Sequence, residues 1–331
     1  NAPLAKGRLS IPAHDDTTSR LRAELEYLRL DELEELESDQ QAKPAVNNML
    51  SLDISSDVLQ IKEMEFSNLV FRSRHQKDQF VIDALNMDRD ALRLRASGKW
   101  QHNPVNAEDV TVFNVDVQGA DLGQAVEGLG LGESIKDGDV SFNGQLGWGG
   151  SLFDINWPTL IGEVDLTVTD GLLRNIEPGA GRFVGLLSFN ALPRRLFLDF
   201  GDVLNQGMQF KKIRGKFKIS GEIMTTENAY LDSESARIRI AGQTNLREQT
   251  YDQKMYITPK IGNTLPVLGS IAAGTTVGWG ILLLQKIFEK PIDKSIELEY
   301  NVSGDWDEPS IELVKKPELE SGLGGSENGQ R

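Results

Sequence analysis

Apolar and polar residues alternate with a period of two along much of the chain. Residues 212–219 show this most clearly, with a basic residue at every second position and an apolar residue or glycine between them. Such alternation is typical of a β-strand with one solvated and one apolar side. The pattern recurs at 92–96, 113–117, 164–168, 237–240 and 296–302. The sequence therefore predicts a mainly β protein built from long strands.

Several of these segments contain a small residue, then a glycine, then a polar or aromatic residue. Ser97-Gly98-Lys99-Trp100 and Ser303-Gly304-Asp305-Trp306 are the clearest examples. We expect strands to end at these motifs, where the glycines permit tight turns or bulges that bend the sheet. The spacing of the motifs is irregular, which argues against a solenoid of fixed period.

Helical patterns are few. They occur at about 122–136, 182–190 and 265–289. Segment 21–36 fits either a strand or a helix, and we favour a strand that leads into a short acidic turn. Residues 317–331 are rich in Gly, Ser and Glu with little apolar material to bury, so we expect a disordered tail there.

A sheet with a continuous apolar side must cover it with helices, with another sheet, or with something other than protein. Three modest helices are too few for so many long strands. The sheet either covers itself, as a sandwich or closed barrel, or forms a long, highly curved antiparallel sheet whose open apolar groove binds acyl chains. We expect the open groove. A strand of about ten residues reaches roughly 33 Å, comparable with the hydrocarbon core of a bilayer.

The residues expected to line this groove lie on the apolar sides of alternating strands. Dispersion and the hydrophobic effect suffice to hold acyl chains, so no specific polar constellation is expected among them. They are Phe113, Val115, Val164, Leu166, Ile213, Phe217, Ile219, Ile238, Ile240, Leu298 and Tyr300.

The charge balance limits the partners. The chain of 331 residues carries 35 Lys and Arg against 50 Asp and Glu, which gives a net charge of −15. This argues against a broad electrostatic grip on nucleic acid or on anionic lipid headgroups, so contact with lipid should be mainly apolar. The chain has no cysteine, which excludes disulfides, thiolate metal sites and cysteine nucleophiles.

Motifs for catalysis or metal binding are missing. His14, His75 and His102 are far apart and match no zinc-site spacing, so we interpret them as surface histidines. Asp15-Asp16 and the acidic segment 31–37 fit a solvated surface better than a cation site. The glycine runs lack the context of a phosphate-binding loop, and no Gly-x-Ser-x-Gly elbow occurs. We therefore expect no enzymatic activity, no metal and no cofactor.

Residues 264–285 carry no formal charge, but they include Pro266 and several glycines. This composition disfavours a membrane-spanning helix, which needs about 20 predominantly apolar residues. The segment either plugs the end of the groove or lies in a membrane interface. In the second case the inserted side chains would be Trp279, Ile281, Leu282, Leu283 and Leu284.

A series of short stretches from residue 170 onward is distinctive. They are Asp-Gly-Leu-Leu at 170–173, Glu-Pro-Gly-Ala-Gly-Arg-Phe-Val-Gly-Leu-Leu-Ser at 177–188, Leu-Pro-Arg-Arg-Leu at 192–196, Asp-Phe-Gly-Asp-Val at 199–203, Thr-Thr-Glu-Asn-Ala at 225–229, Leu-Pro-Val at 265–267, and Val-Ser-Gly-Asp-Trp-Asp-Glu-Pro at 302–309. These stretches resemble the C-terminal region of the YhdP branch of the AsmA-like envelope proteins. The resemblance is specific over 144–316. Before residue 144 it is looser and rests on the strand pattern and the Ser97-Gly98-Lys99-Trp100 motif.

The resemblance implies a periplasmic β-groove that carries phospholipid between the inner and outer membranes. It also implies an inner-membrane anchor, which we expect upstream of a fragment that forms the outer-membrane-proximal end. We divide the chain into groove strands at 1–143, a C-terminal groove region at 144–316 and the tail at 317–331. The alternative function is a non-catalytic envelope scaffold or chaperone that aids outer-membrane assembly. A hydrolase would need paired carboxylates or an activated nucleophile, for which the sequence has no motif.

Overall fold

The computed structural model describes the chain in several segments. They are residues 4–11, 20–30, 45–61, 64–103, 108–125, 135–173, 208–234, 236–260, 297–306 and 309–315. The expected helices at 182–190 and 265–289, the membrane-contacting residues from Trp279 to Leu284 and the tail at 317–331 lie outside the described residues.

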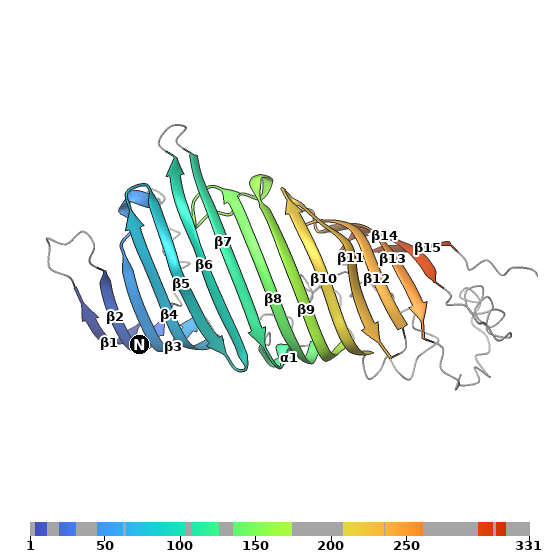
Figure 1. The fold of residues 1–331 in the computed structure, drawn as a ribbon, viewed down its shortest axis with the longest axis horizontal. Coiled ribbons are helices and arrows are strands. Elements are labelled where there is room, and N and C mark those ends of the chain that lie inside the picture. The colour runs from blue at the N-terminus through green and yellow to red at the C-terminus, as the bar shows by residue number, and fades with distance from the viewer. Residues whose placement is uncertain are drawn as a thin grey trace, which may run out of the picture.

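The described strands form one sheet whose spatial order follows the sequence, from β1 to β15 (Figure 1). Neighbouring strands are antiparallel, except for β2 and β3, which are parallel. β1 and β15 lie at opposite edges and do not pair with each other, so the sheet is open and not closed into a barrel. Figure 1 shows the sheet curving at its C-terminal strands. The predicted fold class, a long curved β-sheet that is mainly antiparallel, is confirmed.

Most strands are long, and the helical elements among the described residues are short. The strands are β1 (Ala5–Ser10), β2 (Leu21–Arg29), β3 (Leu52–Ile61), β4 (Met64–Gln76), β5 (Gln79–Arg89), β6 (Leu92–Asn103), β7 (Glu108–Gly119), β8 (Ile135–Gly149), β9 (Ile161–Leu173), β10 (Met208–Ser220), β11 (Ile223–Ser233), β12 (Ala236–Asn245), β13 (Thr250–Pro259), β14 (Leu298–Asp305) and β15 (Ser310–Lys315). The helical elements are the 3-10 turns η2 (Val46–Asn48) and η3 (Trp157–Thr159) and the α-helix α1 (Leu122–Ala125).

β10 illustrates how the sequence gives the sheet two different faces. Its apolar residues Ile213 and Phe217 are buried, whereas Lys216 and Lys218 are exposed. Successive side chains of a strand point to opposite sides of the sheet, so alternation in sequence becomes separation in space. We call the side that carries Ile213 and Phe217 the apolar face and the opposite side the polar face.

In the neighbouring strands β8 and β9, the alternation of buried and exposed residues changes phase by one residue. The change occurs where each strand has a residue with an unusual backbone conformation. Asp137 (φ 58°) and Asp170 (φ 57°) have left-handed backbone conformations, which Asp adopts more readily than most residues. Beyond these bends Ile135 pairs with Leu173, and both are buried. The shift therefore keeps apolar side chains on the apolar face to the ends of both strands.

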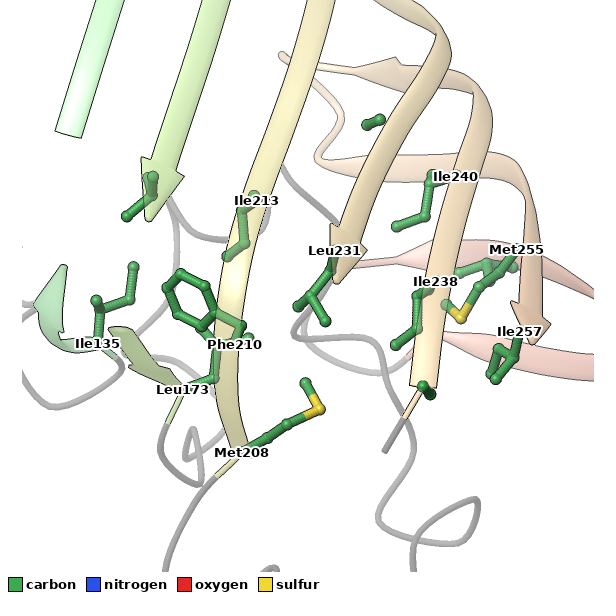
Figure 2. Packing of buried hydrophobic residues seen from close by; sticks show 14 of the residues in the cluster. Ile135, Leu173, Met208, Phe210, Ile213, Leu231, Ile238, Ile240, Met255 and Ile257 are labelled. Carbon is green, nitrogen blue, oxygen red and sulfur yellow. The ribbon is translucent and has the colours of Figure 1, made fainter. Parts of the chain in front are cut away.

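The main core lies on the apolar face between β8 and β14. Figure 2 shows Leu231, Ile238 and Met255, from three consecutive strands, pointing into the same region. A second cluster joins η2, β5 and β6 and consists of Val46, Phe80, Ile82 and Trp100. The larger cluster of buried side chains therefore lies in the C-terminal strands, and a smaller cluster lies near the N-terminal third of the sheet.

Some expectations about individual elements need revision. The strand expected at the start of 21–36 is confirmed by β2. The helix expected at 122–136 is described only over α1, and its expected C-terminal end is wrong because Ile135 and Lys136 begin β8. Ile135 gains a buried position opposite Leu173 as part of a strand, and this tertiary contact outweighs local helix propensity. The division of the chain at residue 143 stays a prediction, and that residue lies inside β8.

The strand end expected at the Ser97-Gly98-Lys99-Trp100 motif is also wrong, because Gly98 lies inside β6. A Cβ atom added at Gly98 would lie 2.5 Å from the carbonyl oxygen of Val112 and 3.0 Å from the ring of Phe113, both on the adjacent strand β7. Gly98 thus permits close packing between two strands. Gly304, with a φ of 87°, does lie next to the end of β14.

Asp83 provides a polar link between β4 and β5 whose strength should depend on pH. Arg74 donates hydrogen bonds to both of its carboxylate oxygens, at 2.6 to 3.0 Å, and Arg20 lies 3.1 Å away. The hydrogen bonds from Arg74, together with both positive charges, hold the pKa of Asp83 below its usual value, although partial burial opposes this. Because the pKa is lower in the folded chain, the ionised carboxylate stabilises the fold at pH values above about 3.9, the pKa in the unfolded chain. This stabilisation is lost as the pH falls from there through the lower pKa of the folded chain.

Asp83→Asn should therefore lower the free energy of unfolding by about 0.5 to 1 kcal/mol at pH 7, a modest effect because the pair is partly solvated. Urea denaturation at pH 7 and at pH 2.5 would measure the difference. The two proteins should converge at pH 2.5. An equal difference at both pH values would contradict the role given to the charge.

Candidate functional site

All the residues predicted to line a groove point to the apolar face. Val115 lies opposite Gly144, Gly144 opposite Val164, and Val164 opposite Phe217. Directly opposed residues in antiparallel strands point to the same side. Val115, Val164 and Phe217 therefore share one face across four strands, from β7 to β10.

A second row continues the apolar face to the C-terminal strands. Ile213 lies opposite Leu231, Leu231 opposite Ile238, and the row continues through Ile257 to Leu298. The other predicted residues join through similar pairs. These pairs are Phe113 with Leu146, Leu166 with Phe142, Ile219 with Met224, Ile240 with Met255, and Met255 with Tyr300.

The predicted residues differ in how much surface they offer. Ile213, Phe217, Ile238, Ile240 and Tyr300 are buried. The others are only partly buried, and they are Phe113, Val115, Val164, Leu166, Ile219 and Leu298. The apolar face therefore offers side-chain surface mainly before β10, while most of its side chains in β10 to β14 serve as protein core.

Other partly buried residues of the same face were not among those predicted. They are Leu85, Met87, Leu94, Val117, Phe142 and Leu146. The alternation at 92–96 and 113–117 marks Leu94 and Val117. The signal in β5 is weaker because its register with β6 shifts between Ile82 and Leu85, which interrupts the period of two.

Several polar groups on the apolar face have partners within the sheet. The amide of Gln253 donates to the hydroxyl of Thr244 at 2.7 Å, and the hydroxyl of Thr111 donates to the carbonyl oxygen of Gly150 at 2.9 Å. Burial raises the pKa of Tyr300 to about 12, so its phenol remains neutral. These groups leave the interior of the face uncharged.

Charged groups on this face occur at the two ends of β5 and β6. Arg89 ends β5, with its guanidinium carbon 5.8 Å from the ring centroid of Phe66. At the opposite end, Trp100 donates from Nε1 to Asp109 at 3.0 Å, and Nδ1 of His102 lies 2.6 Å from the same carboxylate. At β5 and β6 the apolar part of the face is therefore a band about 30 Å across, with polar groups at both ends.

The histidines differ in how they are placed. His102 is partly buried and bound to Asp109, so the expectation of a simple surface histidine does not hold for it. His75 is partly buried at the end of β4, with Nε2 3.1 Å from the carbonyl oxygen of Lys77. His14 lies outside the described residues. His75 and His102 thus make contacts within the sheet.

Two hollows open on the polar face. One of about 780 Å³ crosses β5 to β10, between two rows of outward side chains that include Asp116, Asn143 and Lys216. A second, of about 340 Å³, lies between β10 and β11. These two open hollows therefore lie on the side opposite the apolar band.

Within the ranges given above, no helix has both the length and the apolar character needed to cross a membrane. In the same part of the chain, no three acidic or histidine side chains gather as a possible metal site.

Comparisons with known proteins agree with the resemblance of the sequence. Over 236 residues the chain is 28% identical to the intermembrane phospholipid transporter YhdP of Escherichia coli strain K12. That match covers 71% of this chain but only 18% of the relative, so the chain corresponds to a small part of it. No solved structure matches the chain. The family model described as YhdP protein matches residues 1–311, and the chain therefore belongs to the YhdP family.

Proposed function

We propose that the apolar face holds the acyl chains of phospholipid and forms part of a conduit that carries phospholipid between the inner and outer membranes. The observation that carries this proposal is a continuous apolar face across an open sheet, with side chains left partly exposed over β7 to β9. Contiguous apolar surface of this kind usually marks a binding surface. The similar E. coli protein is named an intermembrane phospholipid transporter.

The width of the apolar band suits a lipid. Each methylene group removed from water contributes about 0.8 kcal/mol, so an acyl chain can be retained without any specific polar contact. A charged headgroup avoids such a surface and would lie at a rim, where Arg89 or the pair of His102 and Asp109 provide polar contacts. A phospholipid bound in this way keeps its acyl chain in contact with apolar side chains and its headgroup in contact with polar groups.

The proposal places the chain in the periplasm, as the outer-membrane-proximal part of a longer protein anchored in the inner membrane. The transport role requires no chemistry, and we propose that the chain is not an enzyme. Its protein partners would be other envelope components. The membrane-contacting role of Trp279, Ile281, Leu282, Leu283 and Leu284 remains part of this proposal, as does the lining role of the apolar-face residues.

The chain expressed in a Gram-negative host and purified without detergent should carry phospholipid. Native mass spectrometry would detect lipid adducts on the folded protein, and thin-layer chromatography of an organic extract would identify their headgroups. Lipid at a stoichiometry of one or more per chain is the expected result. A folded, monomeric chain without lipid would overturn the proposal.

A scaffold or chaperone role is the second candidate, and it is favoured by exposed apolar side chains on the strands at the two edges of the described sheet. In the edge strand β15, Leu313 and Val314 are 42% and 51% exposed, and in β1 at the other edge Leu9 is 57% exposed. Unpaired strand edges can recruit another strand by backbone hydrogen bonding. A lipid-free chain that suppresses aggregation of an unfolded outer-membrane β-barrel protein would support this role.

A further inference from the structure

β10 presents a row of three cations on the polar face. Arg214, Lys216 and Lys218 occupy every second position and are all exposed. The chain as a whole is strongly acidic, with a net charge of −15. Three neighbouring cations on one strand contrast with this overall charge, although β9 places Asp165 opposite Lys216 and Glu163 opposite Lys218.

These cations border a hollow of about 340 Å³ between β10 and β11, which we call the β10–β11 hollow. Its lining combines the three cations with polar side chains of β11 and one carboxylate. The lining residues are Arg214, Lys216, Lys218, Thr225, Glu227, Asn228 and Tyr230. Positive charge thus exceeds negative charge within the hollow.

A β-bulge shapes this hollow. The pairing of β10 with β11 loses its register between Arg214, which lies opposite Tyr230, and Lys218, which lies opposite Thr225. The extra residue in β11 leaves Glu227 and Asn228 exposed in succession beside the cations. Bulges often re-aim side chains next to functional sites. This one interrupts the regular pairing of the two strands between Arg214 and Lys218, next to the cations.

The cations differ in how far they are already neutralised. Lys216 has its Nζ atom 3.2 Å from a carboxylate oxygen of Asp165 on β9. Within the described part of the chain, Arg214 and Lys218 form no ion pair. Two of the three charges thus remain available to an anion.

An arginine of β12 extends the positive region beyond the hollow. Tyr230 lies opposite Arg239, whose guanidinium carbon is 3.8 Å from the ring centroid of Tyr256. This stacking fixes the guanidinium group against the polar face. Arg214, Tyr230, Arg239 and Tyr256 therefore form a row of alternating cations and aromatic rings across four strands.

We propose that the β10–β11 hollow binds a phosphate-bearing anion, with a diphosphate group as the best fit. Arginine presents a planar fork that matches phosphate oxygens, and lysine adds point charges. Side chains two residues apart on a strand start about 6.7 Å from each other, so the row of three spans more than one phosphate group. Asn228 and Tyr230 supply further hydrogen-bond donors.

This site goes beyond the proposed lipid path because it opens on the opposite face of the sheet. The same strand contributes Ile213 and Phe217 to the apolar face and Arg214 and Lys218 to the hollow. Phosphate binding therefore does not depend on whether the apolar face holds acyl chains, and the two proposals can fail separately.

Isothermal titration of the whole chain with pyrophosphate at low ionic strength tests the site directly. A parallel titration with phosphatidate vesicles, against phosphatidylcholine vesicles as blank, distinguishes a phosphate on a lipid headgroup from a phosphate in solution. The test variant is Arg214→Gln with Lys218→Gln. The matched control is Arg237→Gln with Lys254→Gln, which removes the same charges from β12 and β13, outside the hollow.

The test variant should bind pyrophosphate, phosphatidate vesicles or both at least tenfold more weakly than the unmodified chain, because each lost charge-assisted hydrogen bond accounts for roughly that factor. The control should bind as the unmodified chain does. No binding of either probe by the unmodified chain overturns the proposal. An equal loss in the control also overturns it, because binding would then reflect only overall charge.

Discussion

Leu166→Asp should remove bound phospholipid from the chain while the sheet remains folded. Leu166 is partly buried on the apolar face, opposite Phe142 of β8 and Gly215 of β10, so a carboxylate there would stand in the middle of the apolar band. An acyl chain laid across it would have to desolvate the charge, which costs several kcal/mol. We expect the lipid adducts in native mass spectra to fall to the background level.

Thr167→Asp is the matched control, because it adds the same charge one residue along the same strand. Thr167 points to the polar face and lies opposite Arg214, so the added carboxylate stays hydrated and lipid should be retained. Circular dichroism and thermal melting would confirm that both variants fold. Leu166→Ser, which is polar but uncharged, is a milder substitute if the aspartate variant is unstable. Lipid retained by folded Leu166→Asp and Leu166→Ser would contradict the assignment of this face.

Met255→Ala should lower the free energy of unfolding by about 2 to 5 kcal/mol, the usual range for truncating a buried methionine. Met255 has no exposed surface and lies between Ile240 of β12 and Tyr300 of β14. The cavity left by the lost side chain would open in the centre of the main core. Urea denaturation followed by circular dichroism would measure the change.

Lys254→Ala provides the comparison, since it truncates the preceding residue of the same strand on the polar face. Lys254 pairs with Glu299 at 2.9 Å, and its side chain is largely exposed. Exposed ion pairs contribute less than about 1 kcal/mol, so this variant should remain close to the unmodified chain. Similar losses in both variants would argue against a one-sided core in β13.

The sequence was sufficient to predict which residues share a face. Alternation is a local property, and the two-residue repeat of a strand converts it directly into side-chain direction. Ile213 and Ile238 could be assigned to one face without knowing that Leu231 lies between them in the sheet. The pattern was therefore sufficient to predict the candidate face. It did not predict that this face is partly exposed before β10 and mostly buried from β10 onward.

The degree of burial could not be predicted, because it depends on the path of the whole sheet. Phe113 and Ile240 have the same local pattern, yet Phe113 is partly exposed and Ile240 is fully buried. The bulge in β11 was also missed, since one extra residue, as at Glu227 and Asn228, looks like ordinary irregularity in a linear pattern. The β10–β11 hollow depends on this bulge and was not predicted for that reason.

The glycine motifs were the least reliable predictors of strand ends. Gly98 and Gly304 occur in similar motifs, but one lies within a strand beneath Phe113 and the other lies next to a strand end. A glycine is used either for its backbone freedom or for its lack of a side chain, and a single sequence does not distinguish these uses. The close approach of β7 to Gly98 shows that the second use applies there.

The neighbour-to-neighbour order of the strands has a consequence for how the chain acquires its structure. No strand from β3 to β15 has to wait for a partner from a remote part of the sequence, because each pairs with the strand made just before it. Folding rates rise when contacts are local, and such a sheet can grow by adding one hairpin at a time. Assembly can thus proceed from one end as the polypeptide emerges, so that every partly made sheet presents a single growing edge.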